Sequence, residues 1–392
     1  MAIGTKRETR NHALDGLRGL AALAVFCHHC WGHQLGGEHA PFPSSAPEWA
    51  AEELRLSVPL FFVLSGLLIY RGFLGELRRD GEIRLGRYVK RRAARILPAY
   101  YAAIAGVILL LWGSSIPGLG LPPAHDLPLF AIFAQNYDTH TYLTLDSPTW
   151  TLCVEVAFYA ALPLLVWAFA RAGSGLRAQA ALVAFVFFGG IAWHAGCVLS
   201  DAKPVWDNLL PSWLPYFGAG MAVALWAEHR PAVRLSSRVS GVLVGAAAAI
   251  VVADGFYLAT HFGLRTTTLW GEIPVTVGLG LLALVGLRGT GPGLSWMQAR
   301  PLVGMGTISY GFYLWHLPIL FFLRGLYPHG GVIPTFLLAL PLAVAAGIAS
   351  WKLVEEPVLQ AAAARRRPTA RPARSNAPYR PSTPRPASQA SG

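Results

Sequence analysis

The chain has 392 residues, of which 54% are hydrophobic and only 13% charged, with 13 Trp, 13 Tyr and 19 Phe. This composition indicates a polytopic membrane protein, and no soluble domain of even about 60 residues fits between its apolar stretches. The formal net charge of +12 lies in short loops and the C-terminal tail, where membrane topology and anionic lipid explain it, so we expect no nucleic-acid partner.

Apolar stretches of about 20 residues predict an all-α protein with about ten transmembrane helices. The expected spans are 13–34, 57–74, 96–113, 149–170, 179–199, 209–227, 238–260, 270–287, 303–325 and 332–353. A further apolar piece, LPLFAIFAQN at 127–136, is too short to cross the membrane and is interpreted as an interfacial or re-entrant segment.

The distribution of basic residues predicts the orientation of these spans, because Lys and Arg gather in cytoplasmic loops. The basic head of the chain and the strongly basic segment 71–95 belong inside, whereas the acidic segment 36–56 belongs outside. Ten spans then place both termini in the cytoplasm and every later basic loop on the same side. Counting 127–136 as an eleventh span would invert those later loops.

Three regions follow from this pattern: a cytoplasmic N-terminus at 1–12, a transmembrane domain at 13–355 and a Pro- and Arg-rich cytoplasmic tail at 356–392, which is expected to be disordered. The first apolar run is too long for a typical signal peptide and contains charged residues, so we expect it to stay in the membrane. No internal repeat is visible.

The first span, ALDGLRGLAALAVFCHHCW, carries Arg18 and His29. Helical positions eleven apart return to within roughly 20° of one direction, about 16 Å along the axis, so both side chains face one interior stripe. An uncompensated charge near mid-bilayer costs at least about 2.5–3.5 kcal/mol, which makes ionisable residues here functional candidates. Arg18 could instead snorkel to lipid phosphate, and His29 could be a buried neutral histidine.

The fourth span opens with PTWTLCVEVAFY and enters from outside, which puts Glu155 roughly 9 Å below the outer face, near the expected depth of His29. We expect the carboxylate to orient the His29 ring and to stabilise its imidazolium form. The alternative is a Glu that bonds a neighbouring helix. Trp150 is a candidate for substrate binding, with packing at the membrane interface, shared with Tyr159, as the alternative.

Two further apolar helices supply substrate-binding candidates. In MGTISYGFYLWHLPILFF, Ser309, Tyr313 and His316 are spaced to share one helix face, and helix–helix hydrogen bonding is the alternative. Ser65 in VPLFFVLSGLLIY is a candidate for the same pocket, with close packing as the alternative.

The cytoplasmic start of the third span, RRAARILPAYY, contains Arg92 and Arg95. Topology alone would place basic residues there, but arginine forks also suit phosphate groups, and Arg18 is expected nearby. Neighbouring Cys27, His28 and Cys30 do not complete a metal shell with His29, because adjacent helical residues diverge by about 100° and no other Cys/His cluster is present; we expect no metal.

Together these segments resemble the acyltransferase-3 family of integral membrane acyltransferases, over roughly residues 10 to 355. The matching pieces are LDGLRGLAAL followed by His29, FFVLSG, RRAARILPAYY, PTWTLCVEVAFY and ISYGFYLWH. The resemblance implies transfer of an acyl group, typically acetyl, from cytoplasmic acyl-CoA to a hydroxyl of a carbohydrate or a glycosylated small molecule such as a macrolide. It makes His29 and Glu155 catalytic candidates, and Arg18, Arg92 and Arg95 candidates for binding the donor.

The expected protein is therefore an O-acyltransferase of a bacterial cytoplasmic membrane. Its partners would be acyl-CoA as co-substrate, a hydroxyl-bearing glycan or glycoside as acceptor, and membrane lipid. A membrane transporter and a non-catalytic acyl-CoA-binding membrane protein are the alternatives, since both would also place ionisable residues inside a helical bundle.

Overall fold

A computed structural model describes residues 11–34, 46–112, 116, 119–173, 175–200, 204–261, 265–328 and 330–364, and its regular structure there is helical. The ten long helices are α1 (His12–Gln34), α3 (Ser57–Asp80), α4 (Leu85–Leu111), α6 (Trp150–Ala172), α7 (Leu176–Leu199), α9 (Leu210–His229), α10 (Ser237–His261), α11 (Arg265–Arg288), α12 (Arg300–Leu326) and α13 (Val332–Ser350). Each overlaps one of the expected spans, although α4 begins eleven residues before its span and α3 ends six residues after its span.

Short elements connect these helices. They are α2 (Ala46–Glu53), α5 (Leu127–Ala131), α8 (Pro204–Asp207), α14 (Glu356–Ala364), the 3₁₀ turns η1 (Leu54–Leu56), η2 (Gln135–Tyr137), η3 (Ser147–Thr149) and η4 (Pro292–Gln298), and the π-helical turn η5 (Trp351–Glu355). The five-residue α5 is the helical part of the apolar piece 127–136, and at about 1.5 Å per residue it is far too short to cross a membrane.

In the described part of the chain, seven stretches are long and apolar enough to cross a membrane, and they contain α3, α4, α6, α7, α10, α12 and α13. The helices α1 and α9 have sufficient length but fall short in apolar character, and α11 contributes the shorter apolar stretch Ile273–Arg288. The molecule is thus an all-α, multi-pass membrane protein.

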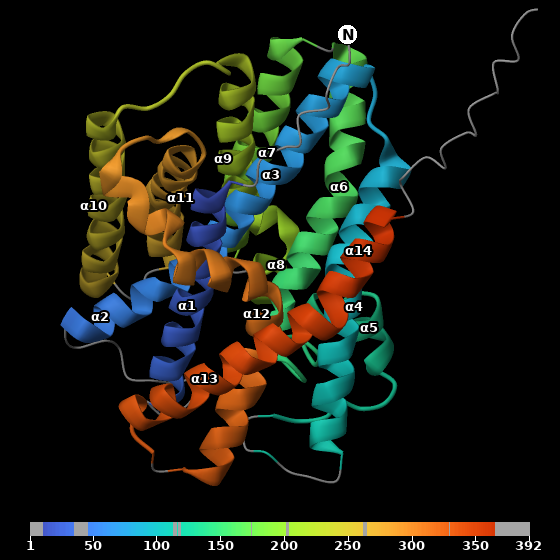
Figure 1. The fold of residues 1–392 in the computed structure, drawn as a ribbon, viewed down its shortest axis with the longest axis vertical. Coiled ribbons are helices and arrows are strands. Elements are labelled where there is room, and N and C mark those ends of the chain that lie inside the picture. The colour runs from blue at the N-terminus through green and yellow to red at the C-terminus, as the bar shows by residue number, and fades with distance from the viewer. Residues whose placement is uncertain are drawn as a thin grey trace, which may run out of the picture.

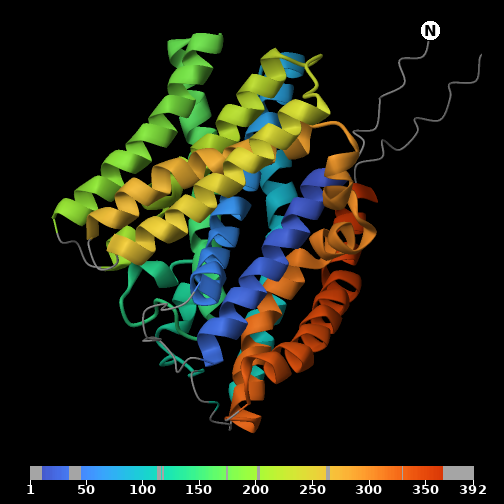
Figure 2. The same cartoon turned by 90° about the vertical axis from the view of Figure 1, so that its left-hand side faces the viewer.

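Helix α1 lies inside the bundle and packs along α12, while α9 packs between α3 and α7 (Figures 1 and 2). The helices α10 and α11 pack on each other at one edge of the molecule, and α13 packs on α12 (Figure 1). The α1–α12 contact positions part of the site described below, because it brings residues near the start of the chain next to residues nearly 290 positions later.

Glycines allow the close approach of α1 and α12. A Cβ added at Gly19 would lie 2.1 Å from the carbonyl oxygen of Leu302, and one added at Gly306 would lie 1.9 Å from that of Asp15. Small residues at helix interfaces are how membrane helices gain close backbone packing, since lipid provides no hydrophobic drive for association.

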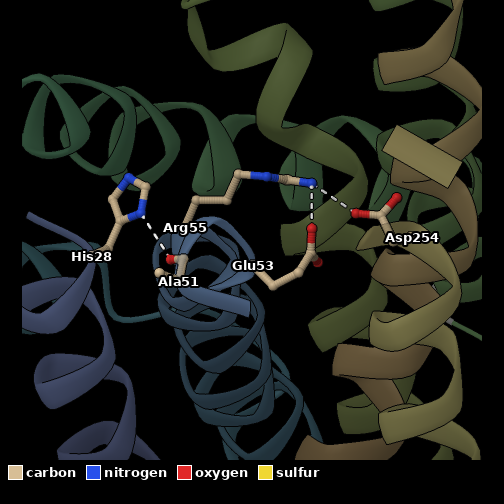
Figure 3. A network of polar contacts seen from close by, with 5 residues as sticks. All are labelled: His28, Ala51, Glu53, Arg55 and Asp254. Atoms are coloured by element: carbon tan, nitrogen blue, oxygen red, sulfur yellow. Dashed lines mark hydrogen bonds and ion pairs between the residues drawn. The ribbon is translucent and has the colours of Figure 1, made fainter. Parts of the chain in front are cut away.

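A network of ion pairs ties α10 to the segment that joins α1 to α3 (Figure 3). Arg55 of η1 donates to Asp254 of α10 at 2.7 Å and lies 3.4 Å from Glu53. Beside it, the Nδ1 atom of His28 lies 3.3 Å from the carbonyl oxygen of Ala51, which links α1 to α2 (Figure 3). The His28 contact holds the part of α1 that carries His29 against α2.

The C-terminal end of the bundle continues α13 through the π turn η5 into α14, which lies beside α4 (Figure 1). The tail expected from residue 356 therefore begins with helix up to Ala364, because Glu356–Ala364 packs on α4 and η5. The tail beyond 364 and the N-terminal segment 1–10 lie outside the described residues.

Candidate functional site

A cavity of about 490 Å³ opens among α1, α3, α4, α6, α12 and α14. It brings together seven of the residues expected from the sequence, namely Arg18, Ser65, Arg92, Arg95, Glu155, Ser309 and Tyr313, and adds Tyr159 and Tyr310. His29, His316 and Trp150 do not line it. The site therefore has two parts, a cavity rich in arginine and a histidine pair beyond it.

Arg18 and Arg92 are the arginines of the cavity that make no ion pair with another described residue. Arg92 lies over the rings of Tyr159 and Tyr88, at 5.3 and 5.9 Å from their centroids, and its Nε is buried with no hydrogen-bond partner. Arg18 interacts electrostatically with Arg95 and Glu155. Two guanidinium groups thus present hydrogen-bond donors to the same cavity.

Arg95 is held in place from the C-terminal end of the chain. Its Nη1 donates to Glu355 at 2.9 Å, and its guanidinium lies over the rings of Tyr310 and Trp351. The other carboxylate oxygen of Glu355 accepts from Ser350 at 3.3 Å. Because Glu355 is 1% exposed, this ion pair is shielded from water and fixes Arg95 at the rim of the cavity.

Glu155 lies in the cavity, and its described hydrogen bonds come from two hydroxyl groups. Ser65 of α3 donates to its Oε1 at 2.5 Å, and Tyr159, one helical turn further along α6, donates to the same atom. Among the described contacts, the expected interaction in which Glu155 orients His29 is not formed, because the carboxylate accepts from α3 and from its own helix instead. Ser65 is thereby bound to the polar network, while the neighbouring Gly66 serves close packing against Phe217.

His29 pairs with His316 across the α1–α12 interface. The Nδ1 atom of His29 lies 2.8 Å from the Nε2 atom of His316, and the rings stack with centroids 5.0 Å apart. The Nδ1 atom of His316 lies 2.6 Å from the carbonyl oxygen of Tyr313. His316 is fully buried, whereas His29 is half-buried. A second histidine is therefore a partner of the His29 ring.

Tyr313 connects the cavity to the histidine pair. Its ring lies 5.5 Å from that of His316 and 6.1 Å from that of Phe61, which also lines the cavity. Its hydroxyl donates to the carbonyl oxygen of Pro148 at 3.1 Å and lies 3.0 Å from the hydroxyl of Thr151. Tyr313 thus contacts both the cavity and His316.

Trp150 contributes packing at the start of α6. Its ring contacts those of Trp213 and Phe62, and its carbonyl oxygen accepts a hydrogen bond from the buried Asn136 at 2.8 Å. Within the described ranges, no group of three His, Cys, Asp or Glu side chains is arranged to hold a metal ion.

Asp146 precedes η3 outside the membrane-spanning segments and is 1% exposed. Both of its carboxylate oxygens are buried without a hydrogen-bond partner. Burial raises the pKa of this carboxyl well above its usual value, because the charged form is poorly solvated there.

Sequence reasoning missed two roles that the structure assigns. Tyr159, interpreted as a packing aromatic, bonds Glu155 and lies under Arg92; its i, i+4 spacing from Glu155 was the available signal. Glu355 was not singled out, although an acidic residue at the end of an apolar helix, just before a basic tail, is itself a signal.

Comparison with known proteins places this site in context. A family model described as "Acyltransferase domain" matches residues 11–352. The "O-acetyltransferase OatA" of Staphylococcus aureus (strain NCTC 8325 / PS 47) is 25% identical over 88% of this chain and 56% of its own length. The "Peptidoglycan O-acetyltransferase OatA" of Listeria monocytogenes serovar 1/2a is 24% identical over 81% of this chain and 50% of its own length. The chain thus spans about half the length of these curated relatives. No solved structure matches.

Proposed function

The chain belongs to the Acyltransferase domain family, and on that basis we propose that it moves an acyl group from cytoplasmic acyl-CoA to a hydroxyl of a carbohydrate or glycoside. The acyl group is acetyl, as the names of the relatives suggest for the reaction class. Acyl-CoA serves as co-substrate, and no metal takes part in this proposal.

The observation that carries the proposal is the pair of arginines in the cavity. Neither Arg18 nor Arg92 forms a short ion pair with a described carboxylate. Arg18 has the electrostatic attraction of Glu155, but a guanidinium inside a membrane protein is stable only when its charge is compensated, and the cavity holds more positive than negative charge. Arginine forks match phosphate oxygens, and the phosphates of CoA would compensate both charges. Arg95, fixed by Glu355, adds a third positive charge at the rim.

The orientation supports delivery from the cytoplasm. We propose ten membrane crossings with both termini cytoplasmic, in a bacterial cell membrane. The ten long helices overlap the expected spans. The arginines of α4 lie in the most basic segment of the chain before the tail, and basic segments stay in the cytoplasm. The arginine end of the cavity then faces the cytoplasm, and His29 lies toward the outer face. The acyl group crosses while CoA stays inside.

The proposed chemistry balances without a further reactant. His29 takes the proton of the acceptor hydroxyl as its oxygen attacks the thioester carbonyl; the carbon–sulfur bond then breaks, and the proton passes to the leaving thiolate. The products are an ester and the CoA thiol. Glu155, bonded by Ser65 and Tyr159, holds a negative charge beside Arg18 and so keeps that arginine oriented toward the donor.

The acceptor is a hydroxyl-bearing glycan or a glycosylated small molecule. The Listeria relative is named for peptidoglycan, which makes a cell-wall glycan the first candidate for this chain, with surface polysaccharides and macrolide glycosides next. Trp150, Tyr313 and Ser65 are the proposed neighbours of the transferred group or its acceptor. Ser65 and Tyr313 line the cavity, Tyr313 also contacts His316, and Trp150 contacts the cavity residue Phe62.

The test is the release of CoA from acetyl-CoA by the purified full chain, with peptidoglycan fragments, oligosaccharides and macrolides as acceptors. We expect acceptor-dependent release that is abolished in His29→Ala and strongly reduced in Glu155→Gln. Equal release by wild type and His29→Ala would overturn the mechanism. Movement of a substrate across vesicles without CoA release would instead support a transporter.

A further inference from the structure

The hydrogen bonds that connect His29, His316 and Tyr313 form a chain with a defined direction. A carbonyl oxygen only accepts, so the contact of 2.6 Å between Tyr313 and His316 requires that the Nδ1 atom of His316 carries a proton. In a neutral imidazole the other nitrogen then has a lone pair, so the Nε2 atom of His316 accepts. The contact of 2.8 Å therefore places a proton on the Nδ1 atom of His29.

We infer that His316 is a positioning residue that fixes His29 in the tautomer with its proton on Nδ1 and its lone pair on Nε2. This inference rests on the proposed function, in which His29 acts as the base. It assigns to the second histidine the role that a carboxylate holds in most histidine-based sites. The role was expected of Glu155, whose hydrogen bonds go to Ser65 and Tyr159.

The same chain stabilises the charge that forms during the reaction. When the Nε2 atom of His29 takes the acceptor proton, the ring becomes an imidazolium and its Nδ1–H continues to donate to His316. No other atom changes its protonation in this step. His316 stays neutral and does not touch the substrate, which is why it positions rather than catalyses.

Packing holds His316 rigidly enough for this role. The ring is 0% exposed, stacks on Phe312 at an interplanar angle of 10° and meets the edge of Phe26 of α1. Pro318 follows within the helix and cannot donate to the carbonyl of Leu314, so the backbone next to His316 departs from the regular pattern. The His316 ring is thus held by an aromatic side chain of its own helix, Phe312, and by one of α1, Phe26.

Two amide substitutions separate the proposed role from simple packing. In His316→Gln the amide group reaches the position of the His316 Nε2 atom, so its oxygen can still accept from His29. In His316→Asn the amide group reaches only the position of Nδ1, so it can bond the carbonyl of Tyr313 but not His29. Both variants are polar and smaller than histidine. They differ in which hydrogen bond they keep: His316→Gln keeps the bond with His29, and His316→Asn keeps the bond with the carbonyl of Tyr313.

The first readout is the steady-state kinetics of acetyl transfer in the full-length wild type and both variants. We expect His316→Asn to lower kcat about 100-fold or more and to leave the KM for acetyl-CoA within about 3-fold, while His316→Gln stays within about 10-fold of wild type. Wild-type kcat in His316→Asn, or equal losses in two variants that keep their melting temperatures, would overturn the inference.

The second readout does not depend on activity. Solid-state ¹⁵N NMR of the histidine-labelled protein reports which ring nitrogen carries the proton, and the His29 signals are those that disappear in His29→Ala. We expect the Nδ1–H tautomer in wild type and in His316→Gln, and a mixture of tautomers in His316→Asn. An Nε2–H tautomer in wild type would overturn the inference, even if acyl transfer itself is observed. The expected tautomer in a chain that releases no CoA would instead refute only the proposed function.

Discussion

At the scale of single residues, Arg92 has the features expected of a group reserved for a ligand. Its aromatic neighbours stabilise the cation without using its hydrogen-bond donors, and its Nε has no partner. We expect Arg92→Ala to raise the KM for acetyl-CoA about 10- to 100-fold, which corresponds to the loss of about 1.5–3 kcal/mol from a charged hydrogen bond, with a smaller change in kcat.

The matched control for this substitution is Arg171→Ala. Arg171 also lies over an aromatic ring, at 3.7 Å from the centroid of Trp167, but it is exposed and outside the cavity. Steady-state kinetics should leave its KM unchanged. A similar rise in both variants would mean that general surface charge, rather than a site at Arg92, attracts the donor.

Asp146 predicts a stability that depends on pH. Its pKa is raised in the folded protein, whereas in the unfolded chain it is about 3.9. Between these values the folded state binds more protons than the unfolded state, so this residue lowers the stability as the pH rises above about 4. Asp146→Asn removes this effect and should raise the melting temperature at pH 8.

Tryptophan fluorescence on heating measures this difference in detergent. The gain from Asp146→Asn should shrink as the pH is lowered toward 5, and Glu82→Gln, at an exposed position, should show no such trend. A gain that is independent of pH would show that the substitution acts through packing instead of charge.

Much of the cavity could be predicted from the sequence at this scale, and the pairing of its residues could not. Arg18 and Glu155 stand out because a charge in an apolar helix is costly, and that cost is visible in a single segment. Arg92 was instead a candidate because arginine forks suit phosphate groups. The partner of His29 depends on which faces of α1 and α12 meet, a property of two segments nearly 290 residues apart. The expected depth in the membrane favoured Glu155 as the partner of His29. In the structure, the face of α12 that meets α1 makes His316 a partner instead.

At the scale of elements, the contact between α1 and α12 sets the distance between the two histidines. A methyl group at Gly306 would collide with the backbone of Asp15, so Gly306→Ala must push the helices apart. We expect a loss of about 1–3 kcal/mol in stability, a lower melting temperature and reduced acetyl transfer.

Gly304→Ala provides the control in the same helix. A methyl group at Gly304 would meet nothing within 4 Å, and alanine favours the helix by about 1 kcal/mol over glycine. This variant should melt at or slightly above the wild-type temperature with full activity. If both variants lost stability equally, helix flexibility rather than close approach would be the property that glycine supplies.

The existence of the long helices was predictable, because an apolar run of about 20 residues is its own signal. Their extent was predicted less well where a helix continues into a basic segment, as α3 does to Asp80 and as α4 does from Leu85. The helices α2 and α14 were not predicted, since each is short and has mixed composition, and tertiary contacts with α10 and α4 support them. For Glu356–Ala364 the sequence predicted a disordered tail, because the segment was judged together with the Pro- and Arg-rich residues that follow it.

At the scale of the whole molecule, the proposed orientation predicts which loops face the outside. In intact cells a membrane-impermeant maleimide should label His140→Cys, which lies in the loop before α6, and should not label Ala232→Cys, between α9 and α10. The four native cysteines are buried or half-buried, so their background should be low. The opposite pattern would mean that segment 127–136 crosses the membrane after all.

The π turn η5 makes the ion pair between Arg95 and Glu355 depend on the number of residues in this segment. A π-helical turn contains one residue more than the α-helical turn it replaces. Deleting one of the four residues 351–354 would restore the regular helix and rotate everything after it by about 100°, which would move Glu355 away from Arg95. A single gap at this point in an alignment therefore marks a different arrangement of the arginines, not a neutral change of length.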